Sequence, residues 1–316
     1  NSMSNPKNLI CYTTEKIGTT KIIQKLAAGV ASLGSDKWTS RVVNIGDFKS
    51  SGHPPDTDAI ATLGILRGTG LALQSAAAAG IDRYYIDHAY FNPGYASKKN
   101  IKKGWMRITK NKHTMNTLPK GEVSSENWKA NFKHNNPIHA WKTRLERGDR
   151  ILVLPPSNAI QWYFNVPAWE EQVVSHLRRI LPIELHKLIK VRRKPKEPIV
   201  DKLGNLLRLD TSVEDDSVTL EEDLLESNVV VAYNSMVALK ATLMGIPVIT
   251  NQHNCCYPIS FKVKDIQPDM SNLNFDVEPN RTKLVRWLSQ CQFSNDQIHS
   301  GIAWTMLQEN NNAINI

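Results

Sequence analysis

The sequence predicts an α/β protein made of two mostly parallel, doubly wound halves. Short apolar runs rich in Val and Ile alternate with helix-length segments along most of the chain, which is typical of parallel sheets covered by helices. The alternation stops once, in a long polar and basic stretch, and resumes at Arg150. A length of 316 residues suits two domains of ordinary size better than one core.

The first half contains four predicted strands and two predicted helices before the pattern stops. A helix is expected over 20–33 because Ile22, Ile23, Leu26 and Val30 recur at helical spacing. The Pro- and Gly-rich stretch 50–58 is expected to be a loop. The strands are expected over 8–13, 41–45, 59–66 and 83–87, and the second helix over 71–79.

The second half repeats the same alternation from Arg150 onward. Thr219 and Glu222 have the spacing of a capping box at the start of a short helix. Strands are expected over 151–154, 186–193, 229–233 and 248–250, and helices over 167–180, 236–244, 282–292 and 302–310. We therefore predict an N-terminal domain over 1–149, with an insertion at about 92–140, and a C-terminal domain over 150–316.

The stretch 228–251 contains the clearest local signals in the chain. A buried strand is followed by Asn234 and Ser235, and Ser235 is a good N-cap for the helix that follows. Gly245 and Pro247 then end that helix before a second short strand. A parallel βαβ unit places the start of its helix at the carboxyl edge of the sheet, where unpaired N–H groups favour an anion.

This stretch resembles the donor-binding half of GT-B glycosyltransferases, and is most similar to the capsule- and Kdo-transferase-like branch. The resemblance rests on a strand, Asn-Ser, a helix of small and apolar residues, and Gly-Ile-Pro-Val; elsewhere it is a likeness of layout. It implies two Rossmann-like domains facing a central cleft, with the last helix returning to the N-terminal domain. The alternative is an ordinary Rossmann-like βαβ unit with a serine cap. The residues implied in donor binding are Arg193, Lys194, Tyr233, Asn234, Ser235 and Met236.

Several side chains at the predicted sheet edge suit catalysis in such an enzyme. Asp87 and His88 end a strand in the half that receives the acceptor in GT-B enzymes, and a carboxylate or an imidazole can take the proton of an acceptor hydroxyl. Glu15, just past the first strand, is the other candidate. Asp87 could equally cap the next turn. Arg193 and Lys194 could stabilise the departing nucleotide, or they could form a solvated basic strand end.

The positive charge of the chain is concentrated in one segment. The segment from Lys98 to Arg150 contains fourteen Lys and Arg and four acidic residues, which gives it a net charge of +10. The whole chain has a net charge of +9, so the remainder sums to about −1. Cations interleaved with Trp105 and Trp128 suit nucleic acid, because cations neutralise phosphates and aromatic rings stack on bases. The residues expected to bind nucleic acid are Lys98, Lys99, Lys102, Lys103, Trp105, Arg107, Lys110 and Lys112.

Other patterns give weaker expectations. Asp56-Thr57-Asp58 matches a metal-binding DxD motif but precedes its strand, so we interpret it as a turn and expect no metal. Gly68-Thr69-Gly70 lacks the remainder of a dinucleotide motif. We expect no cofactor beyond a nucleotide-sugar co-substrate, no membrane span and no signal peptide. Four cysteines without metal-binding spacing favour a reduced, cytoplasmic setting, which would be the host cytoplasm for a phage protein.

These observations together predict a nucleotide-sugar-dependent glycosyltransferase. The sequence favours a hydroxymethylated pyrimidine in DNA as the acceptor, because phage enzymes of this fold class modify such bases. A surface-polysaccharide glycosyltransferase is the first alternative. A non-catalytic nucleic-acid-binding protein on the same scaffold is the second.

Overall fold

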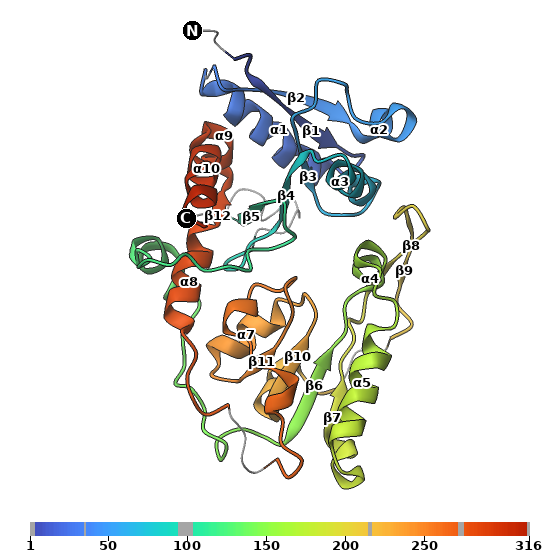
Figure 1. The fold of residues 1–316 in the computed structure, drawn as a ribbon, viewed down its shortest axis with the longest axis vertical. Helices are drawn as coiled ribbons and strands as arrows, with labels where there is room; N and C mark the ends of the chain where they lie inside the picture. Colours follow the sequence, from blue (N-terminus) through green and yellow to red (C-terminus); the bar gives the residue numbers. More distant parts are fainter. Residues whose placement is uncertain (1–3, 35, 94–103, 214–216, 271–274, 315–316) are drawn as a thin grey trace.

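The computed structural model is an α/β protein with one mostly parallel sheet and one fully parallel sheet, which lie one above the other in Figure 1. It describes residues 4–34, 36–93, 104–213, 217–270 and 275–314. Within these ranges no helix combines the length and the apolar character needed to cross a bilayer.

The first sheet has six strands in the order β12-β5-β4-β3-β1-β2. Strands β1 to β4 are parallel to one another, β5 runs antiparallel to β4, and β12 runs antiparallel to β5. The strands span Lys7–Thr13 (β1), Trp38–Asn44 (β2), Ala59–Leu63 (β3), Asp82–His88 (β4), Trp105–Lys110 (β5) and Gln292–Ser294 (β12).

Helices cover both faces of this sheet, because successive residues of each buried strand point to opposite sides. Leu9 and Cys11 of β1 pack in the cluster that contains α1 and α10, whereas Ile10 and Tyr12 pack in the cluster that contains α2 and α3. The helices span Ile17–Ser32 (α1), Ile45–Ser51 (α2), Thr69–Ala78 (α3), Asn295–Ser300 (α9) and Ile302–Ile314 (α10).

The second sheet has four parallel strands in the order β11-β10-β6-β7. Val229 and Val231 face the cluster built on α5, whereas Val230 and Ala232 face the cluster built on α7 and α8. The strands span Arg150–Leu154 (β6), Ile189–Val191 (β7), Ser227–Ala232 (β10) and Val248–Ile249 (β11). The helices span Asn158–Phe164 (α4), Trp169–Ile180 (α5), Leu220–Leu225 (α6), Val237–Leu243 (α7) and Arg281–Gln290 (α8).

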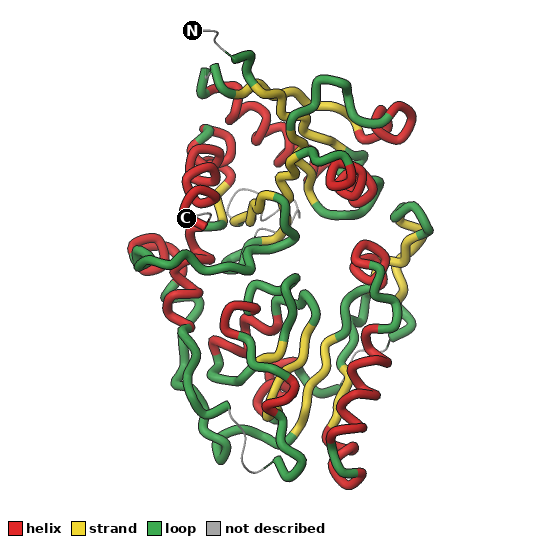
Figure 2. The backbone as a smooth tube through the Cα atoms, in the orientation of Figure 1, coloured by secondary structure: helices red, strands yellow, loops and turns green. Residues whose placement is uncertain are grey.

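The chain returns to the first sheet after α8, as the red ribbon in Figure 1 shows. β12 pairs with β5, and α9 packs against α1. The approach of α9 to α1 requires Gly29, because a Cβ at this position would lie 2.1 Å from the carbonyl oxygen of Ile298. The remaining elements are the hairpin Glu197–Val200 (β8) with Leu206–Asp210 (β9), a π-helix Trp128–Phe132, and 3₁₀ turns Ile183–Leu188, Tyr257–Ile259 and Val263–Asp265. Figure 2 shows how much of the chain between these elements is loop.

Most strand and helix predictions match the structure to within a few residues, and the predicted capping box of Thr219 and Glu222 is present. Four expectations are wrong in their bounds. The third strand ends at Leu63 because Gly64 has φ +72°, which turns the chain. The predicted strand 186–193 is a 3₁₀ turn followed by β7 alone. The predicted loop 50–58 begins with the last two residues of α2. The predicted helix 282–292 ends at Gln290, and β12 follows it.

Candidate functional site

A cleft with a volume of about 590 Å³ lies where the two sheets face each other. Its walls come from the carboxyl ends of β1, β3 and β4 in the first sheet and from the segments after β6 and β10 in the second. Ligands of parallel α/β sheets bind at this edge, because the loops and helix starts that follow the strands meet there. The position of the cleft therefore follows from the topology of both sheets.

The side chains that line the cleft are mostly cationic or hydrogen-bonding. Asp87 is the only carboxylate among the lining residues of the described chain. The cations are Lys16, Arg67, Arg107 and Lys194, and the neutral polar groups include Thr14, Ser157, Asn234 and Ser235. Such a lining suits a ligand with several negative charges.

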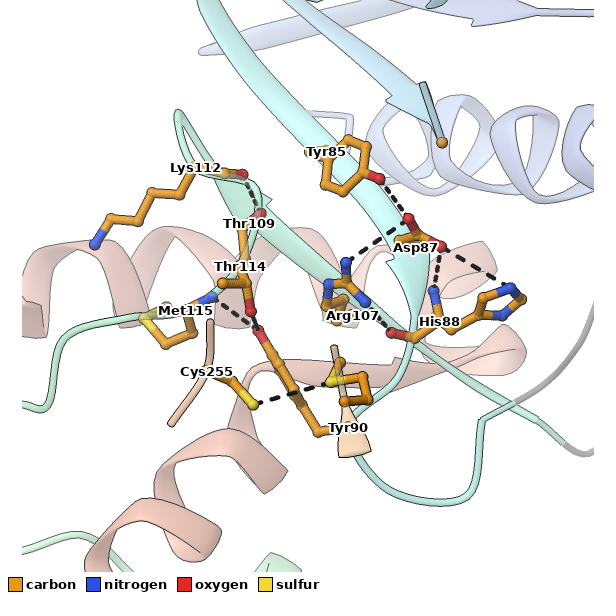
Figure 3. A network of polar contacts seen from close by, with 12 residues as sticks. Tyr85, Asp87, His88, Tyr90, Arg107, Thr109, Lys112, Thr114, Met115 and Cys255 are labelled. Atoms are coloured by element: carbon orange, nitrogen blue, oxygen red, sulfur yellow. Dashed lines mark hydrogen bonds and ion pairs between the residues drawn. The ribbon is translucent and has the colours of Figure 1, made fainter. Parts of the chain in front are cut away.

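The end of β4 holds a polar network (Figure 3). The Tyr85 hydroxyl donates a hydrogen bond to Asp87, and the backbone N–H of His88 donates to the other carboxylate oxygen at 2.8 Å. A guanidinium nitrogen of Arg107 lies 3.7 Å from the carboxylate, and another donates to the carbonyl oxygen of His88 at 2.6 Å. Because Asp87 and Arg107 are opposite each other in the antiparallel pair β4–β5, the strand register itself places the ion pair.

The network keeps Asp87 ionised. Burial alone would raise the pKa of Asp87, but the charges of Arg107 and His88 and the hydrogen bond from Tyr85 outweigh it and lower the pKa to about 2. Burial and the nearby carboxylate raise the pKa of Tyr85 well above its ordinary value. A carboxylate with so low a pKa has little affinity for a proton, and these contacts already occupy both of its oxygens.

His88 presents its ring to the cleft. Its side chain is 45% exposed, and Nε2 lies 4.0 Å from the nearer oxygen of Asp87. The imidazole therefore lies close to the fixed negative charge of Asp87. Of the two adjacent residues that the sequence singled out, His88 is the one whose side chain is open to a ligand.

Glu15 lies apart from this network. Its side chain is 72% exposed and forms an ion pair with Arg67 at 3.4 Å. Arg67, unlike Glu15, is among the residues that line the cleft. The structure therefore does not bring Glu15 together with Asp87 and His88.

The predicted donor residues are divided between the cleft and its surroundings. Lys194, Asn234, Ser235 and Met236 line the cleft, whereas Tyr233 is 6% exposed and packs in the core. Helix α7 begins at Val237 and is seven residues long, with Met236 at the N-cap position, so the predicted cap at Ser235 is wrong by one residue. The Ser235 hydroxyl still accepts a hydrogen bond from the N–H of Val237 at 3.2 Å.

Arg193 faces a smaller neighbouring cavity of about 230 Å³. Its guanidinium forms two hydrogen bonds with the carboxylate of Glu170, at 2.7 and 2.5 Å. A bidentate pair of this kind holds the side chain in one orientation. Lys194 lines both this cavity and the cleft, so it is the cation of the pair that a ligand in the cleft reaches.

The residues expected to bind nucleic acid are dispersed. Lys98, Lys99, Lys102 and Lys103 lie outside the described residues. Arg107 is 6% exposed and pairs with Asp87, so the expectation of a surface phosphate contact is wrong for this residue. Lys110 lies 3.7 Å from Asp82, and Lys112 donates to Asn116 at 3.2 Å.

The aromatic residues of the same segment pack inward. Trp128 is 3% exposed, which contradicts the expectation that its ring stacks on a base. Trp105 contacts Phe132 edge to face, with ring centroids 4.7 Å apart. The indole N–H of Trp141 donates to the carbonyl oxygen of Phe275 at 2.8 Å.

The DxD-like segment is a turn, as predicted. Asp56 forms a bidentate pair with Arg41, at 2.8 and 2.9 Å, and Asp58 accepts the backbone N–H of Asn8 at 2.7 Å. In the part of the chain that the structure describes, no group of three or more His, Cys, Asp or Glu residues could hold a metal ion. Gly68 has φ +98° and starts α3, and the loop before it contributes Gly64 to Arg67 to the cleft.

Sequence reasoning missed several lining residues. Lys16 and Arg67 follow the ends of β1 and β3, and Ser157 follows β6. Because these residues directly follow predicted strands, the sequence could have identified them as residues at the sheet edge. It could not have identified Tyr85, which lies within a strand, or His113, which lies in a segment without a predicted element.

Comparisons with known proteins give little guidance. The chain matches no protein-family model and no curated protein. Among solved structures it is similar to the beta Kdo 2,4 transferase KpsC of Thermosulfurimonas dismutans, with 9% identity over 90% of this chain and 91% of that one, at a TM-score of 0.43. It is also similar to an ABC transporter solute-binding protein from Agrobacterium vitis with bound allitol, with 12% identity over 93% and 97% of the two chains, at a TM-score of 0.25. Both TM-scores are below 0.5.

Proposed function

We propose that the chain is a glycosyltransferase that binds a nucleotide sugar in the cleft and transfers the sugar to a hydroxyl group. The observation that carries the proposal is the cleft itself, where the described residues place four cations and one carboxylate at the carboxyl ends of parallel strands from both sheets. The sequence pattern around Asn234 and Ser235, which resembles the donor side of GT-B enzymes, supports the same assignment.

The cations suit the departing nucleotide. As the sugar–phosphate bond breaks, its electron pair leaves with the nucleotide and negative charge grows on the phosphate oxygen. Lys16, Arg67 and Lys194 reach the cleft from both sheets and can stabilise that charge. Fixed cations act most strongly in a site where water is partly excluded, because the local dielectric constant is low.

His88 is the proposed general base. The acceptor oxygen bonds to the anomeric carbon while its proton passes to the His88 imidazole. Asp87, 4.0 Å away, stabilises the imidazolium that forms. The low pKa of Asp87 and its contacts with Tyr85 and Arg107 suit this positioning role better than proton abstraction.

A carbohydrate hydroxyl is the acceptor that we favour. Another cavity, of about 510 Å³, shares Tyr90 and Met236 with the cleft. It combines apolar and amide or imidazole side chains with the charged residues Glu221 and Lys240. It gives room for a further sugar unit of an extended acceptor. The DNA acceptor loses support from the buried Trp128 and Arg107, although the lysines between 98 and 103 are not described.

Activity measurements test this proposal directly. The purified chain would be incubated with uridine-, guanosine-, adenosine- and cytidine-activated sugars, with an oligosaccharide or a hydroxymethylated duplex as acceptor, and nucleotide release would be measured. We expect release that depends on an oligosaccharide. His88→Gln should lower turnover by about a hundredfold or more while nucleotide affinity is retained. His299→Gln, an exposed histidine on α9, is the matched control.

Other results of the same measurements would support one of the alternative functions or refute the assignment of His88. Release that depends on the modified duplex, and that falls steeply with salt, would establish the DNA-modifying enzyme. Salt-dependent duplex binding without release from any donor would establish a non-catalytic nucleic-acid-binding protein. Unchanged turnover in His88→Gln would refute the assignment of the base.

A further inference from the structure

Another cavity, separate from the cleft, has a volume of about 290 Å³. Its walls come from β4, the turn after β5, the end of α4 and the segment after β11, so both sheets contribute to it. Tyr85 and His113 line both this cavity and the cleft. Their rings are stacked with centroids 4.8 Å apart and form a wall between the two spaces.

The lining of this cavity carries only positive or neutral side chains. Arg83, Lys112, His113 and His253 line it, and none of its lining residues is acidic. Asp82, the acid next to Arg83 in the chain, instead pairs with Lys110 and accepts a hydrogen bond from Asn111. Within the described chain, therefore, the cavity has cations without a neighbouring counter-charge.

The two cations have only neutral partners. Arg83 donates to the carbonyl oxygen of Asn111 at a long 3.4 Å, and Lys112 donates to the side chains of Asn116 and Thr117 at 3.2 and 3.3 Å. No carboxylate of the described residues is within ion-pair distance of either cation. An anionic group in the cavity could therefore pair with both cations.

Two polar atoms at this cavity are also unsatisfied. Arg83 Nε and His113 Nδ1 are buried and have no hydrogen-bond partner among the described residues. Burial lowers the pKa of Lys112, and burial together with the charge of Arg107 lowers the pKa of His113 to about 3. A bound anion would satisfy these atoms and offset the cost of burying the charges.

We propose that this cavity binds a small organic anion, a sugar phosphate or a sugar acid. Arg83 and Lys112 hold its charged group. The Gln252 side-chain amide and the second N–H of the Asn116 amide can bond its hydroxyl groups. The volume lies near the small end of ligand pockets, which suits a ligand of this size. This inference stands on the cavity alone and does not depend on glycosyl transfer in the cleft.

A ligand there would also connect the two sheets. Arg83 belongs to β4 of the first sheet, whereas Gln252 and His253 follow β11 of the second. Direct hydrogen bonds already cross this boundary, including one from the Asn116 side chain to the carbonyl oxygen of Gln252 at 2.7 Å. Because the ligand contacts both sides, its binding should raise the thermal unfolding midpoint of the whole chain.

Calorimetric titration of the full chain tests the proposal, with thermal unfolding as a second readout. The probes are inorganic phosphate, glucose 6-phosphate, gluconate and uncharged glucose. We expect saturable binding of glucose 6-phosphate or gluconate, weaker binding of inorganic phosphate and none of glucose. Arg83→Gln should weaken the binding of the organic anion about tenfold or more. Arg208→Gln, which removes the same charge from the exposed hairpin, is the matched control.

Two further variants separate this cavity from the cleft. Lys112→Gln should weaken binding as Arg83→Gln does, and it serves as the test if Arg83→Gln does not fold. Lys194→Gln removes a cation of the cleft and should leave this binding unchanged. Anion binding that is lost in Lys194→Gln but retained in Arg83→Gln and Lys112→Gln would overturn the proposal. So would equal binding of glucose and glucose 6-phosphate, or no binding of either organic anion.

Discussion

Replacing Asp87 by Asn should destabilise the protein at neutral pH, and the size of the loss follows from the network at the end of β4. The pKa of Asp87 is about 2 in the folded chain and 3.8 for an ordinary aspartate. A shift of one unit corresponds to about 1.36 kcal/mol, so the ionised carboxylate contributes about 2.5 kcal/mol. The variant also leaves Arg107, 6% exposed, without its counter-charge, and breaking a buried pair costs about 3–5 kcal/mol. We therefore expect a loss of about 2.5–5 kcal/mol.

The pH dependence of this loss provides the sharper test. Because the folded pKa is depressed, the contribution of Asp87 is fully present above its unfolded pKa of 3.8 and is lost as the pH falls towards 2. Urea unfolding of both proteins should thus show a constant difference between about pH 5 and 8, and a shrinking difference below pH 4. Asp56→Asn, which removes an exposed carboxylate paired with Arg41, should lose much less.

Two results would refute this reasoning. Equal stability of the wild type and Asp87→Asn at pH 7 would mean that the network does not hold the carboxylate as described. A difference that grows as the pH falls would mean that the folded pKa of Asp87 is raised instead. In that case Asp87 itself would again be the stronger candidate for the general base.

Three further outcomes can be measured with single substitutions. Lys194→Ala should weaken nucleotide binding about tenfold or more in calorimetric titration, whereas Arg193→Ala should change it little, because Glu170 already holds that guanidinium. Gly148→Ala should lower the thermal unfolding midpoint, because its Cβ would lie 2.1 Å from the carbonyl oxygen of Glu226, while Gly121→Ala meets no atom and should not. Trp128→Ala should cost about 3–5 kcal/mol in urea unfolding at any salt concentration, because the ring is 3% exposed. A small loss that varies with salt would instead indicate a surface role for the ring.

The sequence predicted the parts of the fold that local patterns determine. Buried strands such as 151–154 and 229–233 are short apolar runs, and the capping box at Thr219 is a local signal. The strand β5 was not predicted, because its Arg107 and Lys110 lie among many other cations and mask the apolar residues between them. The strand β12, only three residues long, depends on pairing with β5 and has no signal of its own.

The candidate site was predictable to a similar extent. Asp87 and His88 were found because they end a strand, and Lys194 and Ser235 because they follow strands in the second half. The partner of Asp87 could not be found, because Arg107 reaches it only through the antiparallel register of β4 and β5. Charge counting assigned Arg107 to a nucleic-acid surface, since a count of cations does not distinguish a buried cation from an exposed one.

The pairing of β12 with β5 has a consequence for synthesis on the ribosome. When the first five strands have emerged, β5 has an open edge, because Gln292–Ser294 is translated more than 180 residues after Lys110. The close contact of Gly29 on α1 with Ile298 likewise cannot form until Ile298 has been translated. The nascent first sheet therefore exposes a strand edge during translation of the whole second sheet, and exposed edges are where chains associate wrongly. Chaperones that bind nascent chains should protect this edge until the last strand arrives.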